Sequence, residues 1–199
     1  MKLYATPRSH FSRKVRLLLD HMGLTYEMLD VGDVSDHDVE TFHGNPAMGV
    51  PVLEDGAIWM LESDHIASYL VRTYQPADIY GVLTESVDLL NARAVMNSVM
   101  GNEVKLILAE RGGLDPGPHR YFQKARTAIE QGLAWLEARS NLFYSEKPGY
   151  AEFHLVSLWD HLELYQLVEL NYPELRRVAD KLSRSPIFQK SSPLHSAPQ

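Results

Sequence analysis

The segment NPAMGVPVLEDG, residues 45–56, limits more than any other stretch what this chain can fold into. Pro51 lies between Val50 and Val52, where the apolar pattern otherwise predicts a β-strand, and a Glu-Asp-Gly turn and the apolar run AIWML follow. Proline has no backbone N–H to give to a sheet, so Pro51 is expected at the first residue of a strand or on a sheet edge. The segment therefore predicts a β-hairpin that begins at a proline.

Composition excludes several kinds of chemistry. The chain has 199 residues, of which 45% are apolar, and this length suffices for one large or two small cores. The net charge of −7 argues against nucleic acid as a partner. Cysteine is absent, which excludes disulfides, thiolate metal sites and a cysteine nucleophile, so any sulfur chemistry must use a sulfur that a substrate brings. The sequence has no signal-peptide pattern and no membrane-spanning apolar run, so we expect a cytoplasmic protein without a membrane partner.

Strand and helix patterns alternate through the first 76 residues. Alternating and helical apolar spacings predict strands at 2–6 and 25–31, helices at 11–22 and 62–74, and a weaker acidic helix at 33–43. Together with the hairpin, this order of β-α-β-α-β-β-α predicts an α/β unit built on a small mixed sheet.

The apolar pattern of the second part of the chain predicts helices and no strands. After a linker at 77–84, apolar stripes predict helices over residues 87–108, 122–136 and 151–165. Pro173 and Pro186 each occupy a position where a first helical turn can begin. We therefore expect an α/β domain at 1–76, an all-helical domain at 85–190 and a mobile tail at 191–199.

Three motifs in this order resemble one family. The Val-Pro pair before the hairpin, the ESDHI segment after it and the helical segment GYAEFHLVSLWDHLELY resemble a cytosolic glutathione transferase of the bacterial, serine type across essentially the whole chain. The resemblance implies a thioredoxin-like glutathione-binding domain, an all-helical second domain and a homodimer. It also implies a detoxifying enzyme that activates the glutathione thiol for attack on a small apolar electrophile and that uses no metal.

Glutathione has three parts, and the resemblance assigns residues to two of them. A cis peptide bond before Pro51 turns the backbone of Val50 toward the cysteinyl part of the ligand. Glu62 and Ser63, at the start of a helix, suit the ammonium and carboxylate of the γ-glutamyl part, with Asp64 as a further candidate. Taken without the resemblance, Glu62 and Ser63 are more simply a helix cap.

The glycyl carboxylate has no clear partner. Related sequences often carry a lysine just before the Val-Pro pair, whereas this chain has Met48-Gly49 there. Arg13, Lys14 and His43 are the nearby cations that remain as candidates. His65 is a second departure, because the family usually has a small residue at its place.

Activation of the thiol needs one hydroxyl donor. A free thiol has a pKa of about 8.5, so little thiolate exists at neutral pH. By alignment of RKVRLLL with the serine-type transferases, Ser9 lies in the loop before the first helix and is the first candidate, with Ser12 and then Tyr4 as alternatives. The competing interpretation of either serine is an N-cap, a role that serine often fills.

The remaining polar residues carry less information. Asn97, Met100 and Tyr121 are candidates to line the cleft for the second substrate. The acidic run at 33–38 is expected to be a solvated surface, and His154 and His161 are expected to be hydrogen-bonded core residues rather than metal ligands. A second function class stays open, namely a non-catalytic protein on the same scaffold that resembles the stringent starvation protein A group and acts through protein contacts.

Overall fold

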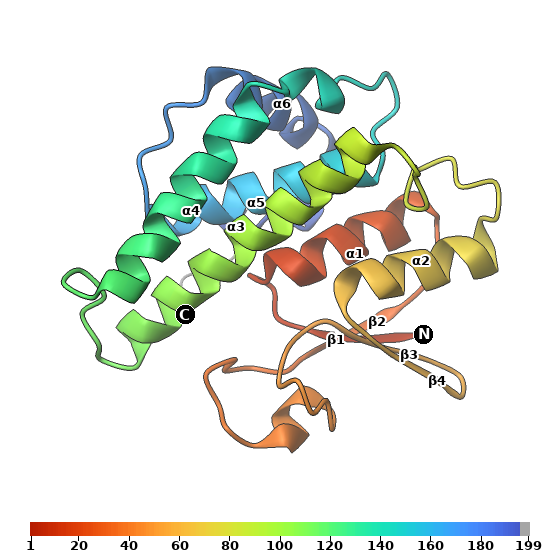
Figure 1. Ribbon diagram of the computed structural model, residues 1–199. Helices are drawn as coiled ribbons and strands as arrows, with labels where there is room; N and C mark the ends of the chain where they lie inside the picture. The colour runs from red at the N-terminus through yellow and green to blue at the C-terminus, as the bar shows by residue number, and fades with distance from the viewer. Residues whose placement is uncertain (196–199) are drawn as a thin grey trace.

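The computed structural model describes residues 1–195 and begins with a four-stranded sheet covered by two helices (Figure 1). The elements of this part are β1 (Lys2–Ala5), α1 (His10–His21), β2 (Glu27–Asp30), β3 (Val52–Asp55), β4 (Ile58–Leu61) and α2 (Ser63–Tyr74). The strand order is β2-β1-β3-β4, in which β1 and β2 are parallel and the other two pairs are antiparallel. The predicted hairpin is therefore β3 and β4, and β3 begins directly after Pro51.

Residues 33–43 differ from the prediction of a helix. The segment contains only the short 3₁₀ helix Val39–Phe42. Asp33 accepts a hydrogen bond from the backbone N–H of Ser35 at 2.9 Å, and Asp36 accepts one from the N–H of Asp38 at 3.1 Å. Short acidic side chains that capture the backbone N–H two residues onward form turns and compete with the helical hydrogen bonds. The acidic run therefore folds as successive turns.

The second part of the chain is helical, as predicted. Its helices are α3 (Val87–Arg111), α4 (Arg120–Glu137), α5 (Tyr150–Tyr165), α6 (Pro173–Ser183) and α7 (Pro186–Lys190), with short 3₁₀ helices at Ser140–Phe143 and Pro193–His195. Both α6 and α7 begin at the predicted prolines. Helix α5 is buried almost throughout and packs against α1, α3 and α6. Among residues 1–195, no helix has the length and apolar character needed to cross a membrane.

The end of the chain corrects the prediction of a mobile tail from residue 191. Ser191 and Ser192 are buried, and the Ser192 hydroxyl donates to the Asp160 carboxylate at 2.7 Å. The 3₁₀ helix that follows packs on α5. Because these polar groups have partners in the core, residues 191–195 belong to the folded structure, and the rest of the predicted tail, 196–199, lies outside the described residues.

Helix α1 joins the two parts through buried charges. Arg13 and Lys14 are both inaccessible to solvent. Arg13 forms an ion pair with Asp160 of α5 at 2.8 Å, and Lys14 forms one with Asp64 of α2 at 2.8 Å. Lys14 also donates to the Asn97 side chain of α3 at 2.9 Å. Because a buried charge is tolerated only with a partner, these contacts fix the helical part against the sheet.

Asp64 is the point at which this network is most concentrated. It accepts hydrogen bonds from Lys14, from Asn97 at 2.7 Å and from the Tyr150 hydroxyl at 2.7 Å, so α1, α3 and α5 all meet at one carboxylate. Burial acts to raise the pKa of Asp64, but the charge and hydrogen bond of Lys14, with the Tyr150 hydroxyl, outweigh it and hold that pKa well below its usual range. Burial lowers the pKa of Lys14 despite the nearby carboxylate.

We predict that Asp64→Asn lowers the free energy of unfolding by about 3 kcal/mol at pH 7, because it leaves the Lys14 charge buried without a counterion. Asp64 has a lower pKa in the folded chain than its ordinary value of about 4, so its stabilising effect is present above that pH and is lost as the pH falls further. Urea unfolding of both proteins from pH 7 to 3 should therefore show their stabilities converging. Asp180→Asn, at an exposed position of α6, is the control, and parallel curves for wild type and Asp64→Asn would contradict the prediction.

Candidate functional site

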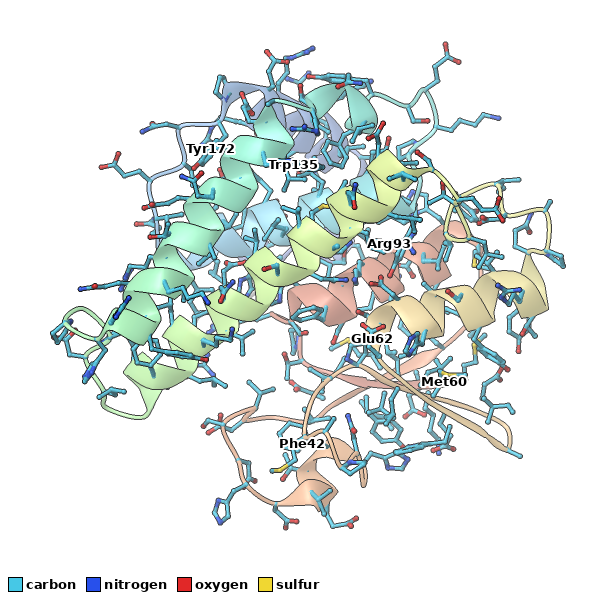
Figure 2. The ribbon with its side chains drawn as sticks, viewed as in Figure 1. Phe42, Met60, Glu62, Arg93, Trp135 and Tyr172 are labelled. Carbon is cyan, nitrogen blue, oxygen red and sulfur yellow. The ribbon has the colours of Figure 1, made fainter. Side chains whose placement is uncertain are left out.

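Three segments with candidate residues meet at one end of the sheet. In the strand register Tyr4 of β1 lies opposite Val52 of β3, which lies opposite Leu61 of β4. One end of the sheet therefore carries the loop that leads from β1 to α1, the start of β3 and the end of β4. Figure 2 shows Glu62 at the start of α2 at this end of the sheet, beside the beginning of α1. Ser9, Val50, Pro51, Glu62 and Ser63 belong to these segments.

Ser9 is the N-cap of α1. Its Oγ accepts hydrogen bonds from the backbone N–H of Ser12 at 3.1 Å and from the Ser12 hydroxyl at 3.0 Å. Ser9 is the acceptor in both bonds, which leaves its own O–H as a donor for a third group. Ser12 is fully buried, and Tyr4 directs its hydroxyl to Glu54 at 3.0 Å while its ring stacks on His43. Of the three candidate hydroxyls, Ser9 alone combines partial exposure with a place in the loop before α1.

The Val50–Pro51 peptide bond is cis. Pro51 is buried and Val50 is half-buried. The turn before them is closed by Asn45, whose side-chain amide donates to the Gly49 carbonyl at 2.7 Å. This turn fixes the direction in which the chain enters β3.

Glu62 and Ser63 form the cap of α2 that the dipeptide predicts. The Glu62 carboxylate accepts hydrogen bonds from the backbone N–H groups of Asp64 at 3.0 Å and His65 at 3.1 Å. Glu62 has φ of +68°, a conformation that is uncommon for residues other than glycine and is often found at functional sites. Ser63 is buried and donates its hydroxyl to Glu62 at 2.9 Å. Glu62 is thus exposed at the helix start, whereas Ser63 is not.

The structure removes two of the three cations proposed for the glycyl carboxylate. Arg13 is paired with Asp160 and also donates to backbone carbonyls of α5 and α7. Lys14 is buried and paired with Asp64. Only His43, whose side chain is 37% exposed, lies at the surface. Buried cations that are already neutralised cannot reach a ligand, so Arg13 and Lys14 are structural charges.

The residues proposed for the second-substrate cleft are not brought together. Asn97 belongs to the buried network around Asp64. Met100 is a fully buried core residue, whereas Tyr121 is 61% exposed on α4. Asp64 is largely buried, with 16% of its side chain exposed, and its oxygens are taken by three donors from other helices.

A buried polar cluster beside the candidate site was missed from the sequence. His10, Glu103 and His161 are all buried, and their ligand-type atoms lie within 4.8 Å of one another, which is the donor set of a possible metal site. Burial raises the pKa of Glu103, although the neighbouring His161 opposes this, and burial lowers the pKa of His10. In the sequence, Glu103 has the helical spacing of Met96 and Met100, which places it on the same buried face of α3 and indicates a buried carboxylate.

The two histidines of α5 behave differently from each other. His161 bonds to Glu103 at 2.9 Å and is a hydrogen-bonded core residue, as predicted. Within residues 1–195, neither ring nitrogen of the buried His154 has a hydrogen-bond partner, which differs from the prediction.

Comparison with known proteins agrees with this geometry. The family model described as "Glutathione S-transferase, N-terminal domain" matches residues 3–78. The chain is 30% identical over 210 aligned positions to a maleylacetoacetate isomerase of Pseudomonas aeruginosa, covering 97% of this chain and 96% of the relative. A glutathione S-transferase of Methylobacterium radiotolerans, solved in complex with glutathione sulfonate, has a TM-score of 0.79 at 22% identity and covers 100% of this chain and 97% of its own. A maleylacetoacetate isomerase of Anaeromyxobacter dehalogenans, solved with glutathione in the active site, has a TM-score of 0.69 at 25% identity, covering 98% and 95% respectively.

The chain belongs to the cytosolic glutathione transferase family, since a relative with 30% identity aligns over nearly all of both proteins. The fold class predicted from the sequence, a thioredoxin-like α/β unit followed by a helical bundle, is confirmed by the family model and the structural likeness.

Proposed function

We propose that this protein is a glutathione-dependent enzyme that uses glutathione as co-substrate and activates its thiol with Ser9. The observation that carries the proposal is that the Ser9 loop, the Val50–Pro51 turn and the Glu62–Ser63 helix start meet at one end of the sheet. The Ser9 loop offers a donor to the thiol, the Val50–Pro51 turn a backbone partner for the cysteinyl part, and the helix start a place for the γ-glutamyl end. In this proposal residues 1–76 form the glutathione-binding domain, 77–84 the linker and 85–190 the helical domain.

The γ-glutamyl end of the ligand binds at the start of α2. Its carboxylate lies at the helix start, where the helix dipole favours an anion, and its ammonium contacts the exposed Glu62 carboxylate, which also accepts from the N–H groups of Asp64 and His65. The cysteinyl part pairs with the backbone of Val50, which is half-buried directly before Pro51. His43 is the candidate left for the glycyl carboxylate, because it is the exposed one of the three; its Nε2 lies 3.2 Å from the Glu54 carboxylate, a contact that the ligand carboxylate would replace.

The chemical step is ionisation of the bound thiol. A decrease of its pKa by about two requires about 2.7 kcal/mol of preferential stabilisation of the thiolate. A hydroxyl that donates to a charged acceptor supplies about 1.5–3 kcal/mol, and a helix N-terminus adds about 0.3–1 kcal/mol. The Ser9 O–H at the N-terminus of α1 combines both contributions, so one residue suffices.

A second candidate reaction is isomerisation of an activated double bond. Two of the relatives described above are named maleylacetoacetate isomerases. A thiolate that adds to an activated alkene makes a single bond about which the adduct rotates, and elimination then returns the thiolate with the alkene isomerised. The same Ser9 site serves both reactions. The relatives described above bear enzyme names, and none of them favours the alternative of a non-catalytic binding protein.

Binding to glutathione is tested first. We predict that the wild-type protein is retained on immobilised glutathione and eluted by free glutathione. Glu62→Ala should weaken the affinity measured by calorimetry about tenfold or more, because it removes both the counterion for the ammonium and the cap that orders the N–H groups. Glu85→Ala, at an exposed position outside the site, is the control. Failure of the wild type to bind would refute the proposed function.

The role of Ser9 is tested by the titration of the bound thiol. Ser9→Ala removes a hydrogen bond to the thiolate that is worth about 1.5–3 kcal/mol and is nearly absent for the neutral thiol. We therefore predict that the pKa of the bound thiol rises and that turnover at neutral pH falls about ten- to a hundredfold, with little change in affinity at a pH where the thiol is protonated. The measurement is the ultraviolet absorbance of the thiolate, titrated in the wild type, Ser9→Ala and Ser12→Ala. A shift in Ser12→Ala alone would assign the donor role to Ser12.

We also propose a homodimer in which the sheet domain of one protomer meets α3 and α4 of the other. Two apolar surfaces support it, since Ile58 and Trp59 of β4 and Val87 and Leu90 of α3 are exposed, Val87 by 69%. We predict a particle of twice 22.6 kDa by light scattering, and Trp59→Lys should shift it toward the monomer. A concentration-independent monomer in the wild type would contradict this.

The cytoplasmic location and the absence of nucleic-acid and membrane partners stay predictions.

A further inference from the structure

The buried cluster of His10, Glu103 and His161 connects the start of α1 to two helices of the other domain. His161 of α5 bonds through Nδ1 to Glu103 of α3 at 2.9 Å, and the two histidine rings stack with centroids 3.8 Å apart and planes 8° from parallel. His10 Nε2 lies 3.2 Å from the Met100 carbonyl of α3 and 3.6 Å from the second oxygen of Glu103. His10 therefore has partners on both α3 and α5.

The geometry favours hydrogen bonding over metal coordination. Two histidines and one glutamate are the ligand types of zinc sites. A ring nitrogen coordinates a metal in the plane of its ring, and two parallel stacked rings direct their nitrogens side by side instead of toward one point. The Met100 carbonyl can only accept, so His10 Nε2 must carry its proton and act as donor there. A metal would require that this bond break and the rings turn.

The cluster is also a poor device for stability alone. His10 Nδ1 and Glu103 Oε2 are buried without a hydrogen-bond partner among residues 1–195. Unpartnered buried polar atoms carry a desolvation cost, and apolar residues of similar volume would fill such a space at least as stably. A buried cluster that bears this desolvation cost is expected to have a role besides stability. His10 directly follows Ser9 in the chain, which places such a role at the candidate site.

We propose that His10 is a positioning residue for Ser9, held by the Met100 carbonyl, Glu103 and His161 so that the Ser9 hydroxyl keeps a fixed direction at the start of α1. This inference rests on the proposed function. The link is short, because one peptide bond separates the two residues and Ser9 already has the extended backbone of an N-cap, with φ of −64° and ψ of 116°. Fixing His10 from α3 and α5 therefore fixes the loop that carries the hydroxyl.

The test compares three variants with one control. His10→Phe keeps a flat ring against His161 but loses the N–H donor, His10→Gln restores an amide donor for the Met100 carbonyl, and Glu103→Gln removes the carboxylate. Glu110→Gln is the matched control, since Glu110 lies on the same helix but is exposed and pairs with Arg126 at 3.8 Å. Circular dichroism and urea unfolding establish that each variant is folded.

The expected result is a change in the pKa of the bound thiol, with no change in the affinity for glutathione. His10→Phe and Glu103→Gln should raise the pKa of bound glutathione and reduce kcat about three- to tenfold at neutral pH, with the affinity for glutathione unchanged, and His10→Gln should recover part of the loss. The effect of His10→Phe should vanish in a Ser9→Ala background, because a residue that acts through Ser9 is not additive with its loss. If His10→Phe does not fold, Glu103→Gln is combined with Ser9→Ala in its place.

Several outcomes would overturn the inference. Unchanged thiol titration in folded His10→Phe and Glu103→Gln, while Ser9→Ala shifts it, would reject the positioning role and leave the proposed function intact. Additive effects of His10→Phe and Ser9→Ala would also reject it. Stoichiometric Zn²⁺ binding to the wild type that Glu103→Gln abolishes would replace it with a metal site. Absence of glutathione binding in the wild type would overturn both this inference and the proposed function.

Discussion

The structure depends on the burial of two adjacent positive charges, Arg13 and Lys14, on α1. Removing a charge from water costs several kcal/mol, and the cost is offset only by a counterion with good hydrogen-bond geometry. The counterions are Asp160 of α5 and Asp64 of α2, so each cation draws a different element onto α1. The Lys14–Asp64 pair holds α1 to α2 within the sheet unit, whereas the Arg13–Asp160 pair and the Lys14–Asn97 hydrogen bond tie α1 to the helical part.

The candidate site benefits from this arrangement because it is built on helix starts. Ser9 and Glu62 are the N-caps of α1 and α2, and both helices are held at their first turns by buried groups from α3 and α5. Loop residues acquire a defined geometry when the rigid elements next to them are fixed. Groups of the helical part, such as the Tyr150 hydroxyl on Asp64, therefore contribute to the site without belonging to it.

Local patterns predicted most of the fold, and tertiary pairing explains most of what they missed. The hairpin after Pro51, the helix beginning at Pro173 and the buried α5 each follow from proline placement or apolar spacing. Residues 33–43 differ from the predicted helix because their weak apolar spacing is outweighed by aspartate side chains that bond to the nearby backbone. The sequence predicts Lys14 as a ligand residue because it displays the charge but not the counterion, which lies fifty positions away at Asp64.

The paired charges also bear on how members of this family can exchange parts. The close contact at Gly149 adds a second requirement, because a side chain there would collide with the Tyr80 carbonyl of the linker at 2.7 Å. A recombinant chain that joins the sheet unit of this protein to the helical unit of a relative lacking Asp160 would leave Arg13 buried without its counterion, and one lacking the glycine would force the Tyr80 carbonyl away. Functional recombinants of homologues should therefore take α1, the linker and α5 from the same parent.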